Sequence, residues 1–494
     1  MPTSPIKRKT FLGYILMLLV LLRCRKETLT SPATPTTTTG GNTAPVNPQD
    51  AYMGQYTVTE AGSNLQPEPA YLSSFHGYTD KLSYLPGDTV NLYLSSSENT
   101  TMNMPLQNGL GETFLSVQVA VKQQKINSAK PWVDGFMYEK TISVKLPNDL
   151  KSGVYSFADI IPVVVRGTEP SYDLTVVYSS NTVNAYNFAG GKSLYAPDYP
   201  NRATVVSFNR PAPIVNSTFF AWLSQQGYNI NYVADIDMDD YSQIENSKAV
   251  VTTGHSEYWS MLARQNIDTF VNSGRNLILL SGNNMWWQVR YNYSKNLMIC
   301  YKSLSGNSYE DLTLDPLAKT IYHTVNWGIN KGDYPIMGSI GADYRWGGYG
   351  MALPNKWGGY KIVKQDSPIL RGSGLSNGDI FFMPSTEYDG TPVVSLFPPG
   401  STEIPVIDNS VLNFYKVELL GYDFALNYIR KDLLGFGMFM VCQKTPASGV
   451  VINGASMDWC SNFALGAAAD PIKIVTKNMI DLSLTNASIF SAAT

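Results

Sequence analysis

The sequence has few charged residues, few cysteines and few histidines, and each shortage excludes a class of function. Charged side chains make up 15% of the 494 residues and the net charge is −3, so the composition offers no basic face to neutralise nucleic-acid phosphates. Only 4 Cys and 3 His are present, and none of them are paired at the spacing of zinc ligands. The odd number of cysteines beyond Cys24 argues against a disulfide framework. We therefore expect neither a nucleic-acid partner nor a Cys/His zinc site.

An apolar run near the N-terminus is too short to cross a bilayer. Lys7-Arg8-Lys9 precedes the apolar residues 11–22, a pattern typical of a signal peptide. Leu21-Leu22-Arg23-Cys24 resembles a bacterial lipoprotein box, and the sequence leaves open whether Cys24 is lipidated or the leader is simply cleaved. Residues 25–70, rich in Thr and Pro, predict a tether. Residues 1–24 thus predict an exported bacterial protein, periplasmic or attached to the membrane through Cys24.

Short strand-like runs separated by turn residues predict that residues 71–169 form a β-sandwich. The runs lie at 90–94, 115–121, 140–144, 153–157 and 160–165. Pro86-Gly87-Asp88 and Pro147-Asn148-Asp149 are typical turn sequences between such strands. We expect an antiparallel sandwich of immunoglobulin-like type, which supplies scaffold rather than chemistry.

Strand-like and helical runs alternate in residues 170–494, which predicts a doubly wound α/β domain. Strands are expected at 174–178, 204–208, 229–233, 249–253, 276–280, 438–441 and 450–453. Helices are expected at 217–226, 260–273 and 470–484. Beyond residue 299 many aromatic and glycine residues predict a loop-rich insertion that covers the carboxyl edge of the parallel sheet. The fold class is therefore α+β and multidomain.

One strand ends in residues able to do chemistry. The apolar pair Val250-Val251 is followed by Gly254 and then by His255-Ser256-Glu257-Tyr258. A turn at Gly254 would place these side chains at the carboxyl edge, where open α/β sheets hold their sites. We take His255 and Glu257 as candidate catalytic residues.

Polar and aromatic side chains also follow the expected strand 276–280 and are candidates to bind substrate. They are Asn283, Asn284, Trp287 and Arg290. Arg290 is suited to clamp a polar or anionic substrate group, or to pair with an acid such as Glu257, and the sequence does not separate these uses.

Six motifs occur in an order that resembles a known family. They are 184–195 (Asn-Ala-Tyr-Asn-Phe-Ala-Gly-Gly-Lys-Ser-Leu-Tyr), 207–211 (Ser-Phe-Asn-Arg-Pro), 254–260, 282–290, 300–302 (Cys-Tyr-Lys) and 454–459 (Gly-Ala-Ser-Met-Asp-Trp). With the preceding sandwich they resemble the large (β) subunit of N,N-dimethylformamidase and proteins that carry its C-terminal domain. The resemblance extends from about residue 71 to the C-terminus.

The resemblance implies a sheet of glutamine-amidotransferase-like topology and a mononuclear Fe(III) site held by two tyrosinates and a glutamate. On that basis Tyr258 and Asp333 are the candidate metal ligands, and Asp458 is a candidate acid/base that moves protons. Family members commonly continue Arg-Pro with an aromatic residue, but this chain has Ala212. If the second ligand belongs at that position, the iron site of this chain is incomplete; Tyr195 and Tyr199 are the alternative sources of a second phenolate, and the spacing favours neither.

The family implies hydrolysis of an amide C–N bond by metal-activated water, and three other interpretations compete with it. Ser256 lies in a Gly-x-Ser pattern, but Tyr258 occupies the position where a nucleophile elbow requires Gly. Glu257 and Glu387 would suit a glycosidase pair, although two unrelated surface carboxylates are the simpler interpretation. The last is a non-catalytic surface lipoprotein that binds glycan or peptide through aromatic loops between Trp327 and Tyr360.

Overall fold

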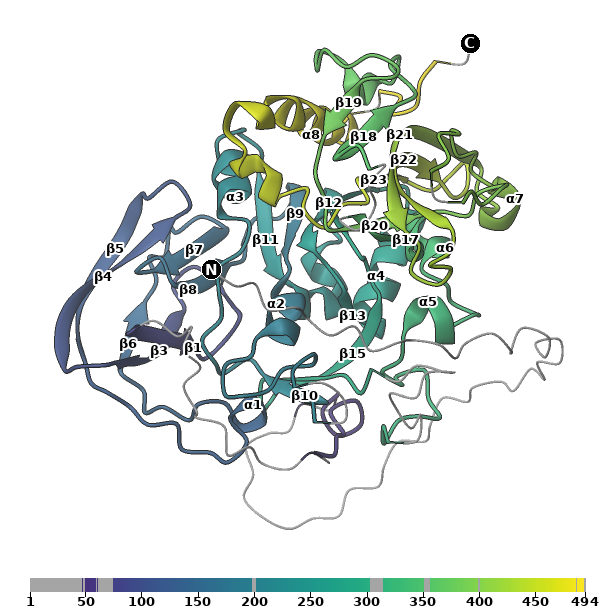
Figure 1. Cartoon of the computed structure of the whole chain (residues 1–494). Helices are drawn as coiled ribbons and strands as arrows, with labels where there is room; N and C mark the ends of the chain where they lie inside the picture. Colours follow the sequence, from purple (N-terminus) through teal and green to yellow (C-terminus); the bar gives the residue numbers. More distant parts are fainter. Residues whose placement is uncertain are drawn as a thin grey trace, which may run out of the picture.

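The protein is a mixed α+β chain in which strands far outnumber helices (Figure 1). The computed structural model describes residues 47, 49–58, 60, 74–197, 201–302, 314–350, 356–398, 400–485 and 487–492. The predicted signal peptide, Cys24, most of the predicted tether and Tyr199 lie outside these residues. Within them, each helix is too short or too polar to traverse a lipid bilayer.

Residues 75–165 form two sheets that enclose one apolar core (Figure 1). One sheet has the order β1 (Phe75–Thr79), β3 (Thr89–Ser96), β6 (Ile142–Lys145). The other has the order β2 (Ser83–Tyr84), β8 (Ile161–Val165), β7 (Gly153–Phe157), β4 (Thr100–Asn108), β5 (Thr113–Val121). Leu92 and Leu94 of β3 are fully buried against Leu106 and Val163 of the second sheet. The predicted strands are present, and β4 escaped prediction because its sequence is polar and contains Pro105.

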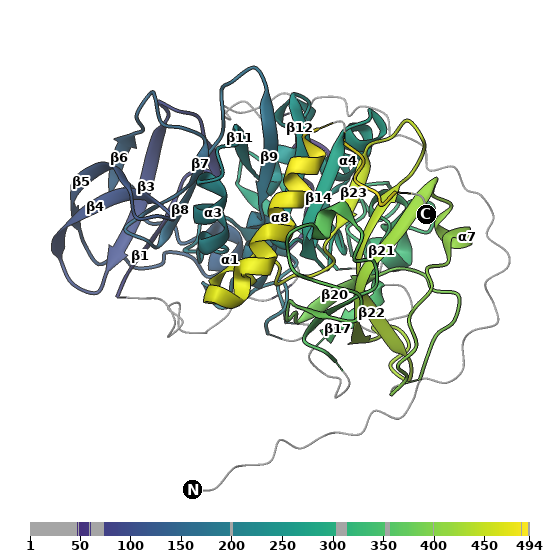
Figure 2. The same ribbon diagram turned by 90° about the horizontal axis from the view of Figure 1, so that it is seen from above.

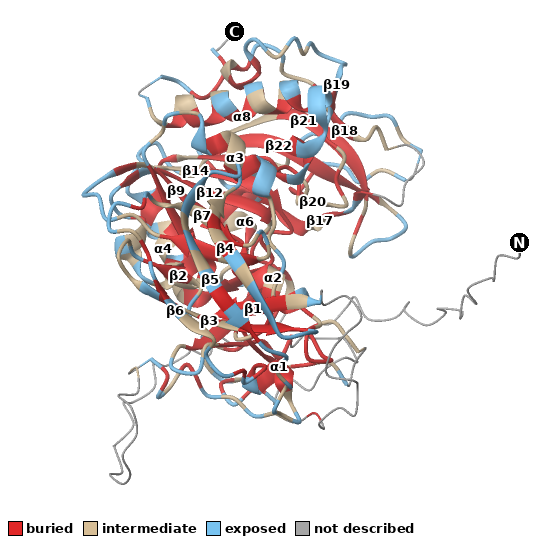
Figure 3. Cartoon of the chain, turned by 90° about the vertical axis from the view of Figure 1, so that its left-hand side faces the viewer, coloured by how far each residue is buried: buried red, intermediate tan, exposed pale blue. Residues whose placement is uncertain are grey.

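Five parallel strands form the centre of the second unit. Their order is β11 (Ile230–Ala234), β9 (Tyr172–Tyr178), β12 (Ser247–His255), β14 (Asn276–Gly282), β23 (Val450–Asn453). Apolar residues of α3 (Ser217–Ser224) and α8 (Asp470–Ser483) pack on one face, and those of α4 (Met261–Asn272) on the other (Figure 2). Since both faces are covered, these strands are buried along nearly their whole length, as Figure 3 shows.

Local sequence signals fix the ends of α4. The Ser260 side chain accepts a hydrogen bond of 2.9 Å from the backbone N–H of Ala263, which caps the first turn. Gly274, with φ of +94°, follows the C-cap and ends the helix in the left-handed conformation that glycine adopts without cost. The helix therefore agrees with its prediction to within a residue at each end.

The region after residue 299 extends the sheet rather than forming only loops over its edge. Beyond β23 the order continues antiparallel as β22 (Leu434–Gln443), β21 (Lys416–Leu426), β17 (Asp343–Tyr349), β20 (Glu387–Gly390), with β18 (Gly359–Ile362) and β19 (Ile380–Phe382) paired beside β21. Short helices connect these elements: α5 (Trp327–Asn330), α6 (Met337–Ile340), α7 (Asn409–Leu412) and the 3₁₀ turns η4 (Pro368–Leu370), η5 (Ser461–Ala464) and η6 (Gly466–Ala469). The loop-rich prediction was incomplete because glycines interrupt the apolar alternation of β17 and β22.

A separate four-stranded sheet lies beside the parallel one. Its order is β10 (Val205–Ser207), β16 (Leu297–Ile299), β15 (Trp287–Asn292), β13 (Tyr258–Ser260). The remaining short elements are α1 (Pro131–Asp134), α2 (Ser180–Tyr186), η1 (Asp235–Asp239) and η2 (Tyr241–Gln243). The expectation that 204–208 joins the parallel sheet was wrong, because β10 pairs antiparallel with β16.

Candidate functional site

The site begins where β12 ends. Gly254 has a φ of +64°, and a Cβ there would lie 2.5 Å from the Asn216 side chain, so only glycine fits this position. His255 is the last residue of β12, opposite Gly282 of β14, and Tyr258 opens β13. The chain thus leaves the parallel sheet between His255 and Tyr258, which places Glu257 in the link between two sheets.

Two carboxylates meet at the His255 imidazole. Nε2 of His255 lies 3.5 Å from Oε2 of Glu257 and 3.3 Å from Oε2 of Glu387 in β20. Asn283 donates through Nδ2 to Oε2 of Glu387 at 2.9 Å, and the same Nδ2 lies 3.4 Å from Nε2 of His255. The interpretation of Glu257 and Glu387 as unrelated surface carboxylates is therefore wrong, because the fold brings them to one nitrogen.

Two tyrosine hydroxyls donate to Glu257. The Tyr186 hydroxyl bonds to Oε2 at 3.0 Å, and the Tyr195 hydroxyl bonds to Oε1. Their rings are stacked with centroids 4.1 Å apart. Bulk solvent hardly reaches the carboxylate, since the Glu257 side chain is only 3% exposed. Three oxygen-bearing side chains thus converge where Glu257 is almost fully buried and Tyr186, which is 44% exposed, borders solvent.

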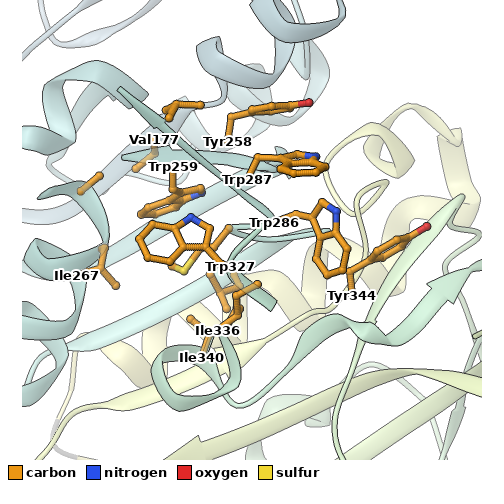
Figure 4. Close-up of a cluster of buried hydrophobic side chains, with 14 of the residues drawn as sticks. Val177, Tyr258, Trp259, Ile267, Trp286, Trp287, Trp327, Ile336, Ile340 and Tyr344 are labelled. Carbon is orange, nitrogen blue, oxygen red and sulfur yellow. The ribbon is translucent and has the colours of Figure 1, made fainter. Parts of the chain in front are cut away.

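Lys302 lies on the buried side of this cluster, beside Tyr195 and Tyr258. Its Nζ donates to the Tyr258 hydroxyl at 3.0 Å and lies 3.2 Å from the centroid of the Tyr195 ring. Trp287 pairs in register with Tyr258, and its ring centroid is 5.0 Å from the same Nζ. Figure 4 shows Tyr258 and Trp287 on neighbouring strands at the border of the buried aromatic cluster. The Lys302 side chain is thus almost fully buried, and its Nζ contacts two aromatic rings and one hydroxyl group.

Burial and neighbouring charges move the pKa values of this cluster in different directions. Burial raises the pKa of Glu257, and the charges of His255 and Lys302 partly oppose the rise. Burial lowers the pKa of Lys302 to about 7, with Glu257 acting in the opposite direction. Burial alone would lower the pKa of His255, but the hydrogen bond with Glu387 and the charges of Glu257, Glu387 and Asp458 raise it. Several shifted pKa values at one place are typical of catalytic sites.

The oxygen donors suit a hard metal ion. Among the residues that the structure describes, His, Cys, Asp and Glu alone form no group of three that could hold a metal. Tyr186, Tyr195 and Glu257 nevertheless present two phenol oxygens and a carboxylate at one place, which is the donor chemistry that Fe(III) prefers. Burial and Glu257 raise the pKa of Tyr195, so its phenolate forms only against a strong positive charge.

Of the predicted metal ligands, Tyr258 lies at the site and Asp333 does not. Tyr258 is 1% exposed and its hydroxyl contacts Lys302. Asp333 is exposed on the loop between α5 and α6, where Lys331 is its charged neighbour. The structure does not bring Tyr258 and Asp333 together. Asp333 belongs to a segment that packs against α4, where its neighbour Tyr334 bonds to Arg264 and Asp268.

Arg290 and Asn284 are structural residues rather than substrate contacts. Arg290 forms a buried ion pair of 2.7 Å with Asp315, and its other donors bond to the carbonyls of Met53, Gln55 and Tyr322. Asn284 is fully buried and donates to Asp389 at 2.7 Å. Of the two uses left open for Arg290, the ion pair is the one observed, although with Asp315 and not with Glu257. The prediction that Asn284 binds substrate is corrected, because its polar groups are bonded inside the protein.

Asp458 and Asn283 both lie at the site, but each is partly engaged in hydrogen bonds within the protein. Oδ2 of Asp458 accepts the backbone N–H of Thr386 at 2.7 Å, so this carboxylate anchors the turn before Glu387. Asp458 also lines a cavity together with His255 and Tyr186. Asn283 is at the centre of the cluster, and its Oδ1 is buried without a hydrogen-bond partner within the described residues.

Sequence reasoning missed Tyr186 and Lys302, and it considered Glu387 only as one carboxylate of a glycosidase pair. Tyr186 and Lys302 lie in motifs that carried the family resemblance, but nothing in their spacing assigned them a role. Glu387 lies 130 residues beyond Glu257 in sequence and reaches it only through the antiparallel extension of the sheet. For Tyr186 and Lys302 the available signal was their presence in ordered motifs, and their roles follow only from the tertiary contacts.

Comparisons with known proteins indicate the family of this chain. Residues 107–471 match the family described as N,N-dimethylformamidase beta subunit-like, C-terminal. A crystal structure of a ThuA-like protein from Bacteroides uniformis is similar at 10% identity, covering 66% of this chain and 96% of that one with a TM-score of 0.31. A comparison with curated proteins found no match. Because the family match spans most of the sequence, the chain belongs to the N,N-dimethylformamidase beta subunit-like family.

Proposed function

We propose that the protein hydrolyses the C–N bond of an amide at the cluster formed by His255, Glu257 and Glu387. The observation that carries the proposal is a single imidazole nitrogen within 3.5 Å of two carboxylates. Family membership supports the same class of hydrolase. In this reaction the oxygen of water bonds to the carbonyl carbon, the C–N bond breaks, and a proton reaches the amine nitrogen.

We assign the Fe(III) ligands to Glu257 and the hydroxyl oxygens of Tyr186 and Tyr195 rather than to Asp333. Bound there, the metal would polarise the amide carbonyl and make water a nucleophile near neutral pH. The two hydroxyl groups already converge on Glu257, so no large rearrangement is needed to place the donors. Lys302 limits the remaining space on the inner side through its contact with the Tyr195 ring.

Proton movement is assigned to Glu387 and His255. Glu387 is held in place by Asn283 and is suited to accept a proton from the attacking water. His255, with a raised pKa, is suited to donate a proton to the departing amine. Asp458 is better assigned to positioning, because its carboxylate already accepts the Thr386 N–H and its charge favours protonated His255.

The N-terminal features belong to the same proposal. A signal peptide at residues 1–24 would export the chain, and lipidation of Cys24 would attach it to a membrane. We further infer that the two-sheet unit is immunoglobulin-like and that the parallel sheet has glutamine-amidotransferase-like topology. The parallel order β11-β9-β12-β14-β23 supports the latter.

Metal content and turnover of single-oxygen variants test this function. Glu257→Gln and Tyr195→Phe should each lose bound iron and its visible tyrosinate absorption band, together with hydrolysis of N,N-dimethylformamide. Tyr258→Phe removes a hydroxyl that contacts Lys302 and should keep the iron. Tyr415→Phe, at a side chain 62% exposed, is the matched control.

Two results would reject the proposal. One is a purified wild-type chain that takes up no iron and cleaves no amide, which would favour the non-catalytic glycan- or peptide-binding alternative. The other is turnover that persists in Glu257→Gln.

A further inference from the structure

A cavity of about 730 Å³ lies directly over His255 and Tyr186. Its wall is built from four separate segments: the turn before β8, helix α2, residues 211–216 and residues 457–461. The sandwich unit and the α/β unit therefore both contribute to it. The cavity reaches Glu257 through the two residues of its floor, since His255 and Tyr186 both contact that carboxylate.

The wall of this cavity is mainly apolar. Ile160, Val183, Phe188, Ile214 and Met457 line it, and each is only half-buried. Apolar side chains that stay partly exposed at the rim of a polar site mark a ligand-binding surface. The wall is therefore built to receive hydrocarbon rather than to complete the protein core.

The ionisable groups of the wall are carboxylates, histidines and the Tyr186 hydroxyl. Asp159 and Asp458 line the cavity beside His255, and no Lys or Arg appears among the described lining residues. A carboxylate or phosphate on the part of the substrate that contacts this wall would meet two negative charges without a lysine or arginine to pair with among the described lining residues. The wall thus disfavours an anionic substrate.

The volume exceeds what the smallest amides need. A cavity of about 730 Å³ falls within the range of about 300–1,000 Å³ that holds ligands of drug-like size. A formamide with a handful of heavy atoms would leave most of the apolar wall in contact with water.

We propose that the substrate is an amide that carries one large, uncharged and mainly apolar substituent, which occupies this cavity. The proposal rests on the amide hydrolysis proposed above. The carbonyl carbon lies at the floor beside His255, water adds its oxygen to that carbon, and the C–N bond breaks to give a carboxylic acid and an amine. The apolar substituent stays in contact with the wall throughout.

Binding of an unreactive series tests the pocket separately from catalysis. The probes are 2-alkanones from 2-butanone to 2-decanone, which keep a carbonyl but have no C–N bond, measured by titration calorimetry on the full chain. Affinity should rise about fourfold for each added methylene, the value for a buried CH₂. 8-Oxononanoate, which keeps the ketone but carries a carboxylate at the far end of its chain, should bind at least about tenfold more weakly than 2-nonanone, because that charge meets the wall that contains Asp159 and Asp458.

Filling the cavity provides the matched variants. Ala212 and Ile214 line it, so Ala212→Trp and Ile214→Trp should each abolish the gain with chain length. Ala120→Trp, on an exposed position of β5, should behave as the wild type. Two cavity-filling substitutions are used so that the test still stands if one of the variants fails to fold.

Hydrolysis of N,N-dimethylformamide and N,N-dimethyloctanamide, measured in parallel, separates the two proposals. Cleavage of dimethylformamide together with flat alkanone binding, or equal binding of 8-oxononanoate and 2-nonanone, would overturn the apolar-substrate inference and leave the hydrolase intact. Steep alkanone binding with no cleavage of either amide would instead overturn the proposed hydrolysis. Preferred cleavage of the octanamide, lost in both cavity-filling variants, is the expected result.

Discussion

Lys302 should make the stability of this protein depend on pH in a way that one substitution removes. The side chain is 3% exposed, and burial lowers its pKa from 10.5 to about 7. Because the unfolded lysine keeps its ordinary affinity for protons, the unfolded state binds more protons than the folded state between these two values. Stability must therefore rise with pH across that window.

The magnitude follows from the same two pKa values. Between about pH 7 and about pH 9.5, proton linkage at Lys302 should add about 3 kcal/mol to the free energy of unfolding. Lys302→Met keeps an unbranched side chain of similar length but has no ionisable group. Loss of the hydrogen bond to the Tyr258 hydroxyl should cost about 1 kcal/mol at every pH, so it does not alter the slope.

Urea denaturation at several pH values measures this effect. The difference in unfolding free energy between the wild type and Lys302→Met should change by about 3 kcal/mol over the window, in favour of the wild type at high pH. Lys140→Met, at an exposed lysine, should follow the wild type. Parallel pH curves for the wild type and Lys302→Met would refute the lowered pKa of Lys302 in the folded protein.

Three further predictions address the neighbouring residues. His255 has a raised pKa in the folded protein, so its contribution to stability is present below the unfolded value of about 6.5 and is lost as pH rises. In urea titrations, His255→Gln should therefore lower the free energy of unfolding more at about pH 5.5 than at about pH 8.5. Arg290→Met leaves the buried Asp315 carboxylate without its partner and should cost about 3–5 kcal/mol in calorimetric stability, part of which Arg290→Met/Asp315→Asn should restore. Gly282→Ala would place a Cβ 2.3 Å from the backbone nitrogen of Met457, and should lower stability by about 1–3 kcal/mol, whereas Gly332→Ala meets no atom within 4 Å and should be neutral. Unchanged thermal midpoints in Arg290→Met or Gly282→Ala would contradict these contacts.

The sequence by itself determined most of the parallel sheet and its helices. The apolar residues of β12 and β14, the cap at Ser260 and Gly274 are local signals, and local hydrogen bonds and backbone preferences act on them directly. The ordered motifs also indicated the family that the match over residues 107–471 shows. His255 and Glu257 could be identified as candidates because they directly follow a buried strand.

Only the tertiary structure decided which side chains share the site. Glu387, Tyr186 and Lys302 join His255 because separate strands and helices bring them there, and no local pattern records such contacts. The same reason explains the errors: Arg290 was drawn into an ion pair with Asp315, and Asp333 stayed at an exposed loop beside Lys331. A charged residue looks alike in sequence whether it meets a substrate or a buried partner. Long-range packing alone distinguishes the two.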